Sequence, residues 1–349
     1  MLAARIHKFG RQSKVCIDRV EKPVCNKNEV LVELYASSIN HLDLWVKKGI
    51  PGIKINLPFT LGSDGAGVIV EIGENVKDWK IGDKIIIQPG IFCGNCLFCK
   101  MNKENQCLKY GILGETHNGT HCEYIALDSK YIYPKFSHLS FQEAASIPLT
   151  YMTAYEMLVA KAKLSKNENV LIYGATSGVG NAAIKIAKSI GAKIISTVGS
   201  ENKIDFAKKA GSDFVFLHNE DDLYSKIKAI TGYQGIQVVF EHIGKDTWQN
   251  SLKLLSKGGR IVTCGSTTGS KVSIDLQHLF YKQQSILGST MSSINEFEKM
   301  MKFVNNNQIS PSIDRVFNLD RINNAYKYIE ERNQKGKIVI SINDKSNTL

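Results

Sequence analysis

Four cysteines lie close together in the segment 93–107, in the arrangement C-x2-C-x2-C-x7-C. They are Cys93, Cys96, Cys99 and Cys107. Four thiolates on one short loop can complete a tetrahedral zinc shell, and a shell filled by sulfur leaves no position open for substrate. The spacing therefore predicts one structural Zn²⁺. The alternative is an iron–sulfur cluster, whose cysteines usually follow other spacings.

A glycine-rich segment, G-A-T-S-G-V-G, follows one apolar run and precedes another that has helical periodicity. Glycine permits a tight turn and a close approach of the backbone to a pyrophosphate, and the amides that open a helix bind phosphate. The segment therefore predicts a dinucleotide site, with a strand–helix turn that binds nothing as the alternative. We assign to the cofactor the residues Gly174, Ser177, Gly178, Val179 and Gly180.

The choice between NAD and NADP depends on the end of the next expected strand, at 193–197. NAD enzymes usually carry Asp or Glu there, which accepts hydrogen bonds from the ribose hydroxyls. No acid ends this strand, and Ser200 and Lys203 follow it. A hydroxyl and an ammonium suit a 2′-phosphate, so the sequence favours NADPH over NADH. The alternative for Lys203 is a solvated helix surface.

The elements that position these motifs belong to two regions with different sequence patterns. Residues 1–140 form short apolar runs broken by Gly, Pro and Asn, which predict strands, with one short helix at 41–48. Residues 141–163 are helical in pattern, and six strands that alternate with helices then predict a doubly wound parallel sheet. Those strands are expected at 170–173, 193–197, 214–217, 238–240, 260–264 and 285–287, and the helices at 179–190, 203–210, 223–231, 248–256 and 276–282.

Composition restricts the class of protein. A chain of 349 residues predicts about two domains. The 44 basic and 33 acidic residues give a net charge of +11, but lysines are spread among acids without a basic stripe or tail. We therefore expect a small-molecule substrate and no nucleic-acid partner. No apolar run predicts a membrane span or a signal peptide, which favours the cytoplasm.

Taken together, the motifs resemble those of the medium-chain dehydrogenase/reductase family, which contains zinc-type alcohol dehydrogenases and quinone oxidoreductases. The resemblance also includes S-I-N-H-L-D at 38–43, G-S-D-G-A-G at 62–67 and G-G-R at 258–260. It implies an α/β fold with a GroES-like, mainly-β catalytic domain at 1–147 and 289–349, and a Rossmann domain at 148–288. It also implies a homodimer or homotetramer.

The resemblance fails at the catalytic zinc. The zinc alcohol dehydrogenases of this family bind that ion through a Cys, a His, and a further Cys or acid. Matched by motif, these positions are Asn40, Ser63 and Leu149, and Asp64 replaces the Glu that usually follows the His. An amide, a hydroxyl and an alkyl group do not make a catalytic zinc site.

Without a Lewis acid, the expected reaction is hydride transfer from NADPH to a quinone or an α,β-unsaturated carbonyl, with hydrogen-bond donors replacing the metal. We expect Asn40 and Ser63 to be these donors and Trp45 to form an apolar wall, and we include Asp64 among the catalytic candidates. Quinone oxidoreductases resemble this chain in having an Asn at the Asn40 position and an aromatic residue near Trp45. The other interpretation of Asn40 is a helix N-cap.

The resemblance implies further cofactor residues. His41 matches a basic residue that contacts the pyrophosphate, and Thr153 matches a Thr that packs against the nicotinamide. Gly265, Ser266 and Ser289 end later strands on the cofactor side. His242 also ends a strand, where it is expected to line the adenosine site.

Two rival functions stay open at this point. The first is a zinc-dependent alcohol dehydrogenase with atypical ligands, drawn from His41, Asp43 and Asp64. The second is a non-enzymatic protein that binds RNA or a partner through its basic surface.

Overall fold

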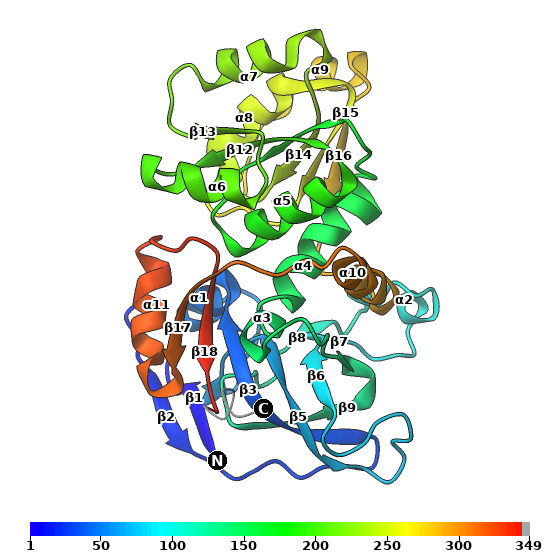
Figure 1. The fold of residues 1–349 in the computed structure, drawn as a ribbon, viewed down its shortest axis with the longest axis vertical. Helices are drawn as coiled ribbons and strands as arrows, with labels where there is room; N and C mark the ends of the chain where they lie inside the picture. Colours follow the sequence, from blue (N-terminus) through cyan, green and yellow to red (C-terminus); the bar gives the residue numbers. More distant parts are fainter. Residues whose placement is uncertain (344–349) are drawn as a thin grey trace. The chain divides into compact units, whose positions relative to one another are not determined.

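The computed structural model describes residues 1–343, and the chain forms two compact units (Figure 1). The first unit contains residues 1–149 and 293–297 and the chain from 301 onward, so both ends of the sequence build it. The second unit contains residues 150–292 and 298–300. Residues 344–349, which fall within the expected catalytic domain, lie outside the described residues. Within the described part of the chain, no helix is long and apolar enough to cross a membrane.

The second unit is a sheet flanked by helices (Figure 1). Its strands are β11 (Asn169–Ile172), β12 (Lys193–Val198), β13 (Phe214–Leu217), β14 (Ile236–Glu241), β15 (Leu255–Thr263) and β16 (Ser285–Gly288). Its helices are α4 (Pro148–Tyr155), a π-helical turn (Glu156–Lys161), α5 (Gly178–Ile190), α6 (Ile204–Ala210), α7 (Leu223–Thr231), α8 (Lys245–Leu254) and α9 (Leu276–Tyr281), with 3-10 turns at Glu201–Lys203 and Gly232–Gln234.

These strands pair in the order β13-β12-β11-β14-β15-β16, and all neighbours are parallel. This is the strand order of a doubly wound nucleotide-binding sheet, so the fold expected from the sequence is confirmed. Strand β11 lies in the middle, and its Val170, Leu171 and Ile172 are fully buried, as an apolar run covered on both faces requires. The loops after these strands therefore gather at one edge of the sheet.

Two local predictions, one at the boundary of this unit and one within it, are wrong. The helix expected over 141–163 is interrupted, because Pro148 lacks an amide hydrogen and begins a new helix, α4. The helix expected to reach residue 256 ends at Leu254, and β15 begins directly at Leu255. Leu255 is buried and pairs with Ile236 of β14, so the sheet takes up residues whose local pattern is helical.

The first unit is mainly β-structure with short helices. Its strands are β1 (Leu2–Ile6), β2 (Val15–Arg19), β3 (Glu29–Ile39), β4 (Phe59–Thr60), β5 (Asp64–Ile72), β6 (Lys84–Ile87), β7 (Gly90–Ile91), β8 (Gly111–Ile112), β9 (Tyr124–Asp128), β10 (Ile132–Pro134), β17 (Ile313–Asn318) and β18 (Lys337–Ser341). Its helices are α1 (His41–Lys48), α2 (Leu97–Lys100), α3 (Phe141–Ala144), α10 (Ile294–Asn306) and α11 (Ile322–Glu330), with 3-10 turns at Glu104–Gln106, Ser129–Tyr131 and Leu319–Arg321.

The long strand β3 organises this unit. It pairs with β5, β9 and β18 inside a sheet ordered β10-β6-β5-β3-β18-β17. Ser38 of β3 lies opposite Asp64, the first residue of β5, and Ile39 lies opposite Ile338 of β18. The end of β3 and the starts of β5 and β18 therefore meet, and this brings together three polar residues from distant parts of the sequence.

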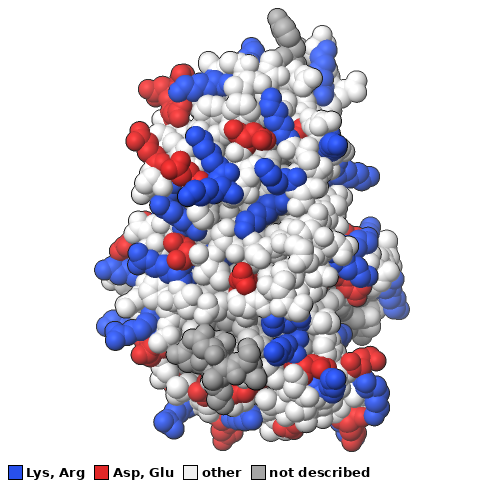
Figure 2. All heavy atoms as spheres, viewed as in Figure 1, with Lys and Arg blue, Asp and Glu red and all other residues white. Residues whose placement is uncertain are grey.

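The surface agrees with the charge pattern of the sequence. Figure 2 shows Lys and Arg side chains interspersed with Asp and Glu over the visible face, without a continuous basic stripe.

Candidate functional site

A buried polar network lies where the three strand ends meet. Lys337 Nζ donates to Asn40 Oδ1 at 2.7 Å, to Asp64 Oδ2 at 3.0 Å and to the carbonyl of Ile39 at 3.1 Å. Asn40 Nδ2 donates to Asp64 Oδ2 at 2.9 Å. Asp64 and Lys337 are 0% and 4% exposed, so the ion pair lies in a medium where an unpaired charge is costly.

The network fixes the orientation of the Asn40 amide. An ammonium only donates hydrogen bonds and a carboxylate only accepts them, so the amide oxygen must face Lys337 and its nitrogen must face Asp64. The second hydrogen on Nδ2 finds no acceptor among residues 1–343. Asn40 is the N-cap residue of α1, yet its side chain belongs to this network.

Asp64 also anchors the surrounding backbone. Its Oδ2 accepts from the Ser38 hydroxyl at 2.9 Å, and its Oδ1 accepts from the amide of Leu149 at 2.8 Å. Leu149, the position matched to the third zinc ligand, thus contributes its backbone to this network. Both oxygens of the Asp64 carboxylate are used in hydrogen bonds within the first unit.

Asp43 forms a second buried carboxylate site. Burial raises its pKa to about 7, although the amides of Asn40 and Gly62 donate to it at 2.7 and 3.0 Å. Gly62 has a φ of +97°, and a Cβ there would lie 2.5 Å from Nδ1 of His121, so this position requires glycine. Asp43 therefore ties the start of α1 to the turn that carries Ser63.

The remaining candidates of the first unit have different environments. Ser63 is fully buried, and its hydroxyl has no hydrogen-bond partner in the described part of the chain. Trp45 is 43% exposed on α1, and His41 opens that helix with a partly exposed side chain. No contact described for this unit places Trp45 beside a substrate, so its role as an apolar wall of the substrate site stays a prediction.

Two buried residues near the site were missed by sequence reasoning. Lys337 is the first residue of an apolar strand, K-I-V-I-S. A lysine beside such an apolar run was the available sequence signal for a buried charge. His121 is fully buried, its Nδ1 lies 2.7 Å from the Ser37 hydroxyl, and burial lowers its pKa to about 3. His121 is therefore neutral at physiological pH and cannot supply a charge to the site.

The four cysteines come together as expected. Their sulfur atoms all lie within 4.8 Å of one another, with 3.4 Å between Cys93 and Cys107 and 3.5 Å between Cys96 and Cys99. A tetrahedral ZnS₄ centre with bonds of about 2.3 Å needs sulfur separations of about 3.8 Å, so the set fits zinc. Within residues 1–343, no other group of three or more His, Cys, Asp or Glu residues is spaced to hold a metal.

The glycine loop adopts the geometry of a phosphate-binding turn. Gly174 has a φ of +61°, and a Cβ on Gly180 would lie 2.3 Å from the carbonyl oxygen of Gly174. Ser177 is the N-cap of α5, and its hydroxyl accepts from the amide of Gly180 at 3.0 Å. The amides of Gly178 and Val179 open α5, where the helix dipole favours an anion. These residues fit the pyrophosphate of a nicotinamide dinucleotide.

The other cofactor candidates of the second unit follow its strands. Ser200 and Lys203 come after β12, and the Ser200 hydroxyl donates to Asn202 at 2.7 Å. Gly265 and Ser266 follow β15 and Ser289 follows β16, at the same edge of the sheet as the glycine loop. Thr153 is buried on α4. His242 follows β14 and donates from Nε2 to the carbonyl of Tyr173 at 2.9 Å, beside that loop.

Comparison with known proteins defines the class. Residues 26–137 match the family model described as "Alcohol dehydrogenase GroES-like domain", and residues 178–306 match "Zinc-binding dehydrogenase". An NAD-dependent alcohol dehydrogenase of Sulfolobus acidocaldarius is 30% identical over 98% of this chain and 100% of its own length. The chain therefore belongs to the medium-chain dehydrogenase/reductase family and is an oxidoreductase.

Individual relatives bear different names. The human quinone oxidoreductase is 28% identical, with 94% of each chain covered. A crystal structure titled as an NAD-dependent alcohol dehydrogenase is 37% identical, covers 98% of this chain and 100% of its own, and superposes with a TM-score of 0.93.

The cysteine cluster gives the first testable prediction. Cys99→Ser removes one of four sulfur ligands, so we expect most of the zinc to be lost and the Tm to fall, measured by elemental mass spectrometry and thermal unfolding. Cys16→Ser, which changes an exposed cysteine outside the cluster, is the control and should retain the zinc. Full zinc content in Cys99→Ser would contradict the Cys₄ assignment.

Proposed function

We propose that this oxidoreductase transfers hydride from NADPH to a quinone or an α,β-unsaturated carbonyl compound without a catalytic zinc. The observation that carries the proposal is the Asn40 amide, held at 2.7 Å from the Lys337 ammonium and at 2.9 Å from the Asp64 carboxylate. Asn40 stands where zinc alcohol dehydrogenases of this family have a cysteine ligand. Its oxygen and one N–H are already engaged, and the other N–H has no acceptor in the described part of the chain, so in this proposal it donates to a substrate.

The chemistry needs a donor for negative charge. When bound, NADPH would supply a hydride to the electron-poor conjugated carbon, and negative charge would develop on the carbonyl oxygen of the substrate. The second N–H of Asn40 would donate to that oxygen, and the unpaired hydroxyl of Ser63 is the other candidate donor. A fixed donor in a dry site stabilises the developing charge without reorganising.

Lys337 and Asp64 would act through Asn40. The ammonium withdraws electron density from the amide oxygen, which makes the N–H groups of the same amide stronger donors. Asp64 accepts one of those hydrogens and neutralises the ammonium, so the buried network carries no net charge. The pair therefore orients and polarises Asn40, while Asn40 itself contacts the substrate.

The similarity to the human quinone oxidoreductase supports this proposal. The similarity to archaeal alcohol dehydrogenase supports the rival, a zinc-dependent alcohol dehydrogenase with atypical ligands. That rival would need Asp43 or Asp64 as a ligand, and these carboxylates accept hydrogen bonds from Asn40, Gly62, Ser38 and Leu149. Metal binding there would have to break those hydrogen bonds, which disfavours the rival.

We propose NADPH as the cofactor. Its pyrophosphate would bind at the start of α5, with His41 as a further contact, and its 2′-phosphate would bind at Ser200 and Lys203. The nicotinamide would be held by Thr153 and by the backbone after β15 and β16, at Gly265, Ser266 and Ser289. The cysteine cluster, whose thiolates must stay reduced, supports a cytoplasmic protein.

A homodimer formed through the second unit is the assembly that we propose. Strand β16 is the edge strand of its sheet, so one side of its backbone lacks a strand partner in the described chain. The neighbouring α9 exposes Leu276, Phe280 and Tyr281, which are each about two-thirds or more exposed (68%, 69% and 73%). An open edge beside exposed apolar side chains suits a second copy of the same surface.

Asn40→Leu tests the proposed donor. This change keeps the size of the side chain and removes its hydrogen bonds, so we expect kcat for a quinone or enone to fall about 10²–10³-fold, as for other oxyanion donors. NADPH binding should be unchanged. Asn169→Leu is the matched control, because Asn169 is equally buried and bonds to the Gly235 carbonyl in the other unit. A kcat equal to that of the control would refute the role of Asn40.

Ser200→Asp tests the cofactor assignment. A carboxylate at this position would repel a 2′-phosphate and accept hydrogen bonds from ribose hydroxyls, so the ratio of kcat/KM for NADPH to that for NADH should fall by at least tenfold. Steady-state kinetics with both cofactors measure the ratio. An unchanged ratio would mean that the 2′-phosphate does not bind here.

A further inference from the structure

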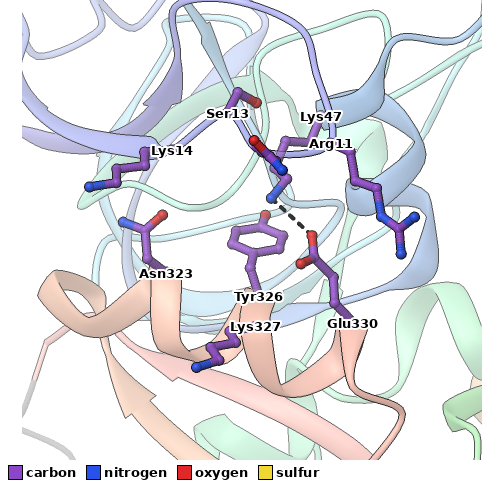
Figure 3. A pocket seen from close by; sticks show the side chains of 9 residues that line it. Arg11, Ser13, Lys14, Lys47, Asn323, Tyr326, Lys327 and Glu330 are labelled. Carbon is purple, nitrogen blue, oxygen red and sulfur yellow. Dashed lines mark hydrogen bonds and ion pairs between the residues drawn. The ribbon is translucent and has the colours of Figure 1, made fainter.

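A polar recess lies in the first unit, between the loop after β1, the end of α1 and one face of α11 (Figure 3). Its volume is about 370 Å³, within the range of small-molecule sites. Its α11 side is formed by four residues on one face of that helix, namely Asn323, Tyr326, Lys327 and Glu330. None of these residues belongs to the site proposed for hydride transfer.

The floor of the recess contains a buried cation with unused donors. The side chain of Lys47 is 8% exposed, and its ammonium donates to Glu330 Oε1 at 3.0 Å. An ammonium has three N–H groups, and residues 1–343 provide no second acceptor for it. Buried donors are normally all satisfied, so this ammonium is suited to bind further oxygen atoms.

A second buried group beside Lys47 is also unpaired. The side chain of Tyr326 is 1% exposed, and its hydroxyl has no hydrogen-bond partner in the described chain. Figure 3 shows Tyr326 in the middle of the recess next to Lys47, whose Nζ lies 5.7 Å from the centre of the ring. The floor therefore places the Lys47 ammonium near the ring of a tyrosine whose hydroxyl is unpaired.

The rim adds positive charge that the protein does not neutralise. Arg11 and Lys14 come from the loop after β1, and neither forms an ion pair within residues 1–343. Lys327 lies on α11 and has only a long, exposed contact of 3.9 Å with Glu331. Glu330 is the one acidic side chain in the lining, and it is already paired with Lys47. Four cations against one carboxylate give the recess a formal charge of +3.

We propose that this recess is a binding site for a small phosphate-bearing ligand. A phosphate group carries up to two negative charges and three acceptor oxygens, which match the unused donors of Lys47 and Tyr326 and the cations of the rim. The donors converge in one small, open recess on a single unit, which suits a terminal phosphate rather than the continuous backbone of a nucleic acid. Lys47 lies in the last turn of α1, about 10 Å along the helix from Asn40.

Calorimetric titration of the full-length protein tests this site. Inorganic phosphate and glucose 6-phosphate are titrated separately, at low ionic strength and in saturating NADP⁺, so that the glycine loop is already filled. We expect one ligand per chain. Tighter binding of glucose 6-phosphate would indicate a phosphate ester as the ligand, and equal binding would indicate free phosphate.

Two variants test whether the ligand binds in the recess. Arg11→Ala removes an exposed rim cation, and Lys47→Met removes the buried ammonium, so each should weaken binding about tenfold or more, since a hydrogen bond to a charged group contributes about 1.5–3 kcal/mol. Lys77→Ala changes an exposed lysine outside the recess and should bind as the native chain does. Absence of binding by both probes, or equal affinity in Arg11→Ala and the native chain, would overturn the proposal. Neither result depends on whether the enzyme reduces quinones.

Discussion

The buried ion pair between Lys337 and Asp64 is the interaction on which the first unit and its proposed site depend. Its two charges lie at the starts of β18 and β5, and both hold the Asn40 side chain at the end of β3. Removing either partner would leave an uncompensated charge in a dry interior, which costs several kcal/mol. The register of three strands and the orientation of one amide are therefore set by the same contact.

The proposed chemistry follows from this constraint. A zinc ion polarises a carbonyl by direct coordination, whereas a fixed amide donates a hydrogen bond whose strength its neighbours adjust. This difference limits the substrates. An amide donor suits the charge of an enolate or a reduced quinone, which is better stabilised by hydrogen bonding than the charge of a bare alkoxide. In this proposal zinc has a structural role alone, at the four cysteines of the loop 93–107, whose spacing fits one Zn²⁺.

Sequence reasoning succeeded where the signal was local. The cysteine spacing, the glycine loop and the six strands of the second unit each depend on residues close together in the chain, whereas the role of Asn40, inferred from its motif, stays a prediction. Lys337 was missed because it is 297 residues from Asn40, and only the pairing of β18 with β3 brings them together. The helix break at Pro148 was visible in the sequence, whereas the early start of β15 was not, because tertiary pairing overrides a local helical pattern.

The most direct test of the account is the metal content of the native protein, determined by elemental mass spectrometry on protein purified without added metal and compared with its activity. We expect one zinc per chain, together with NADPH-dependent reduction of a quinone or an enone. Two zinc ions per chain, with oxidation of an alcohol that is lost when the second ion is removed, would contradict it.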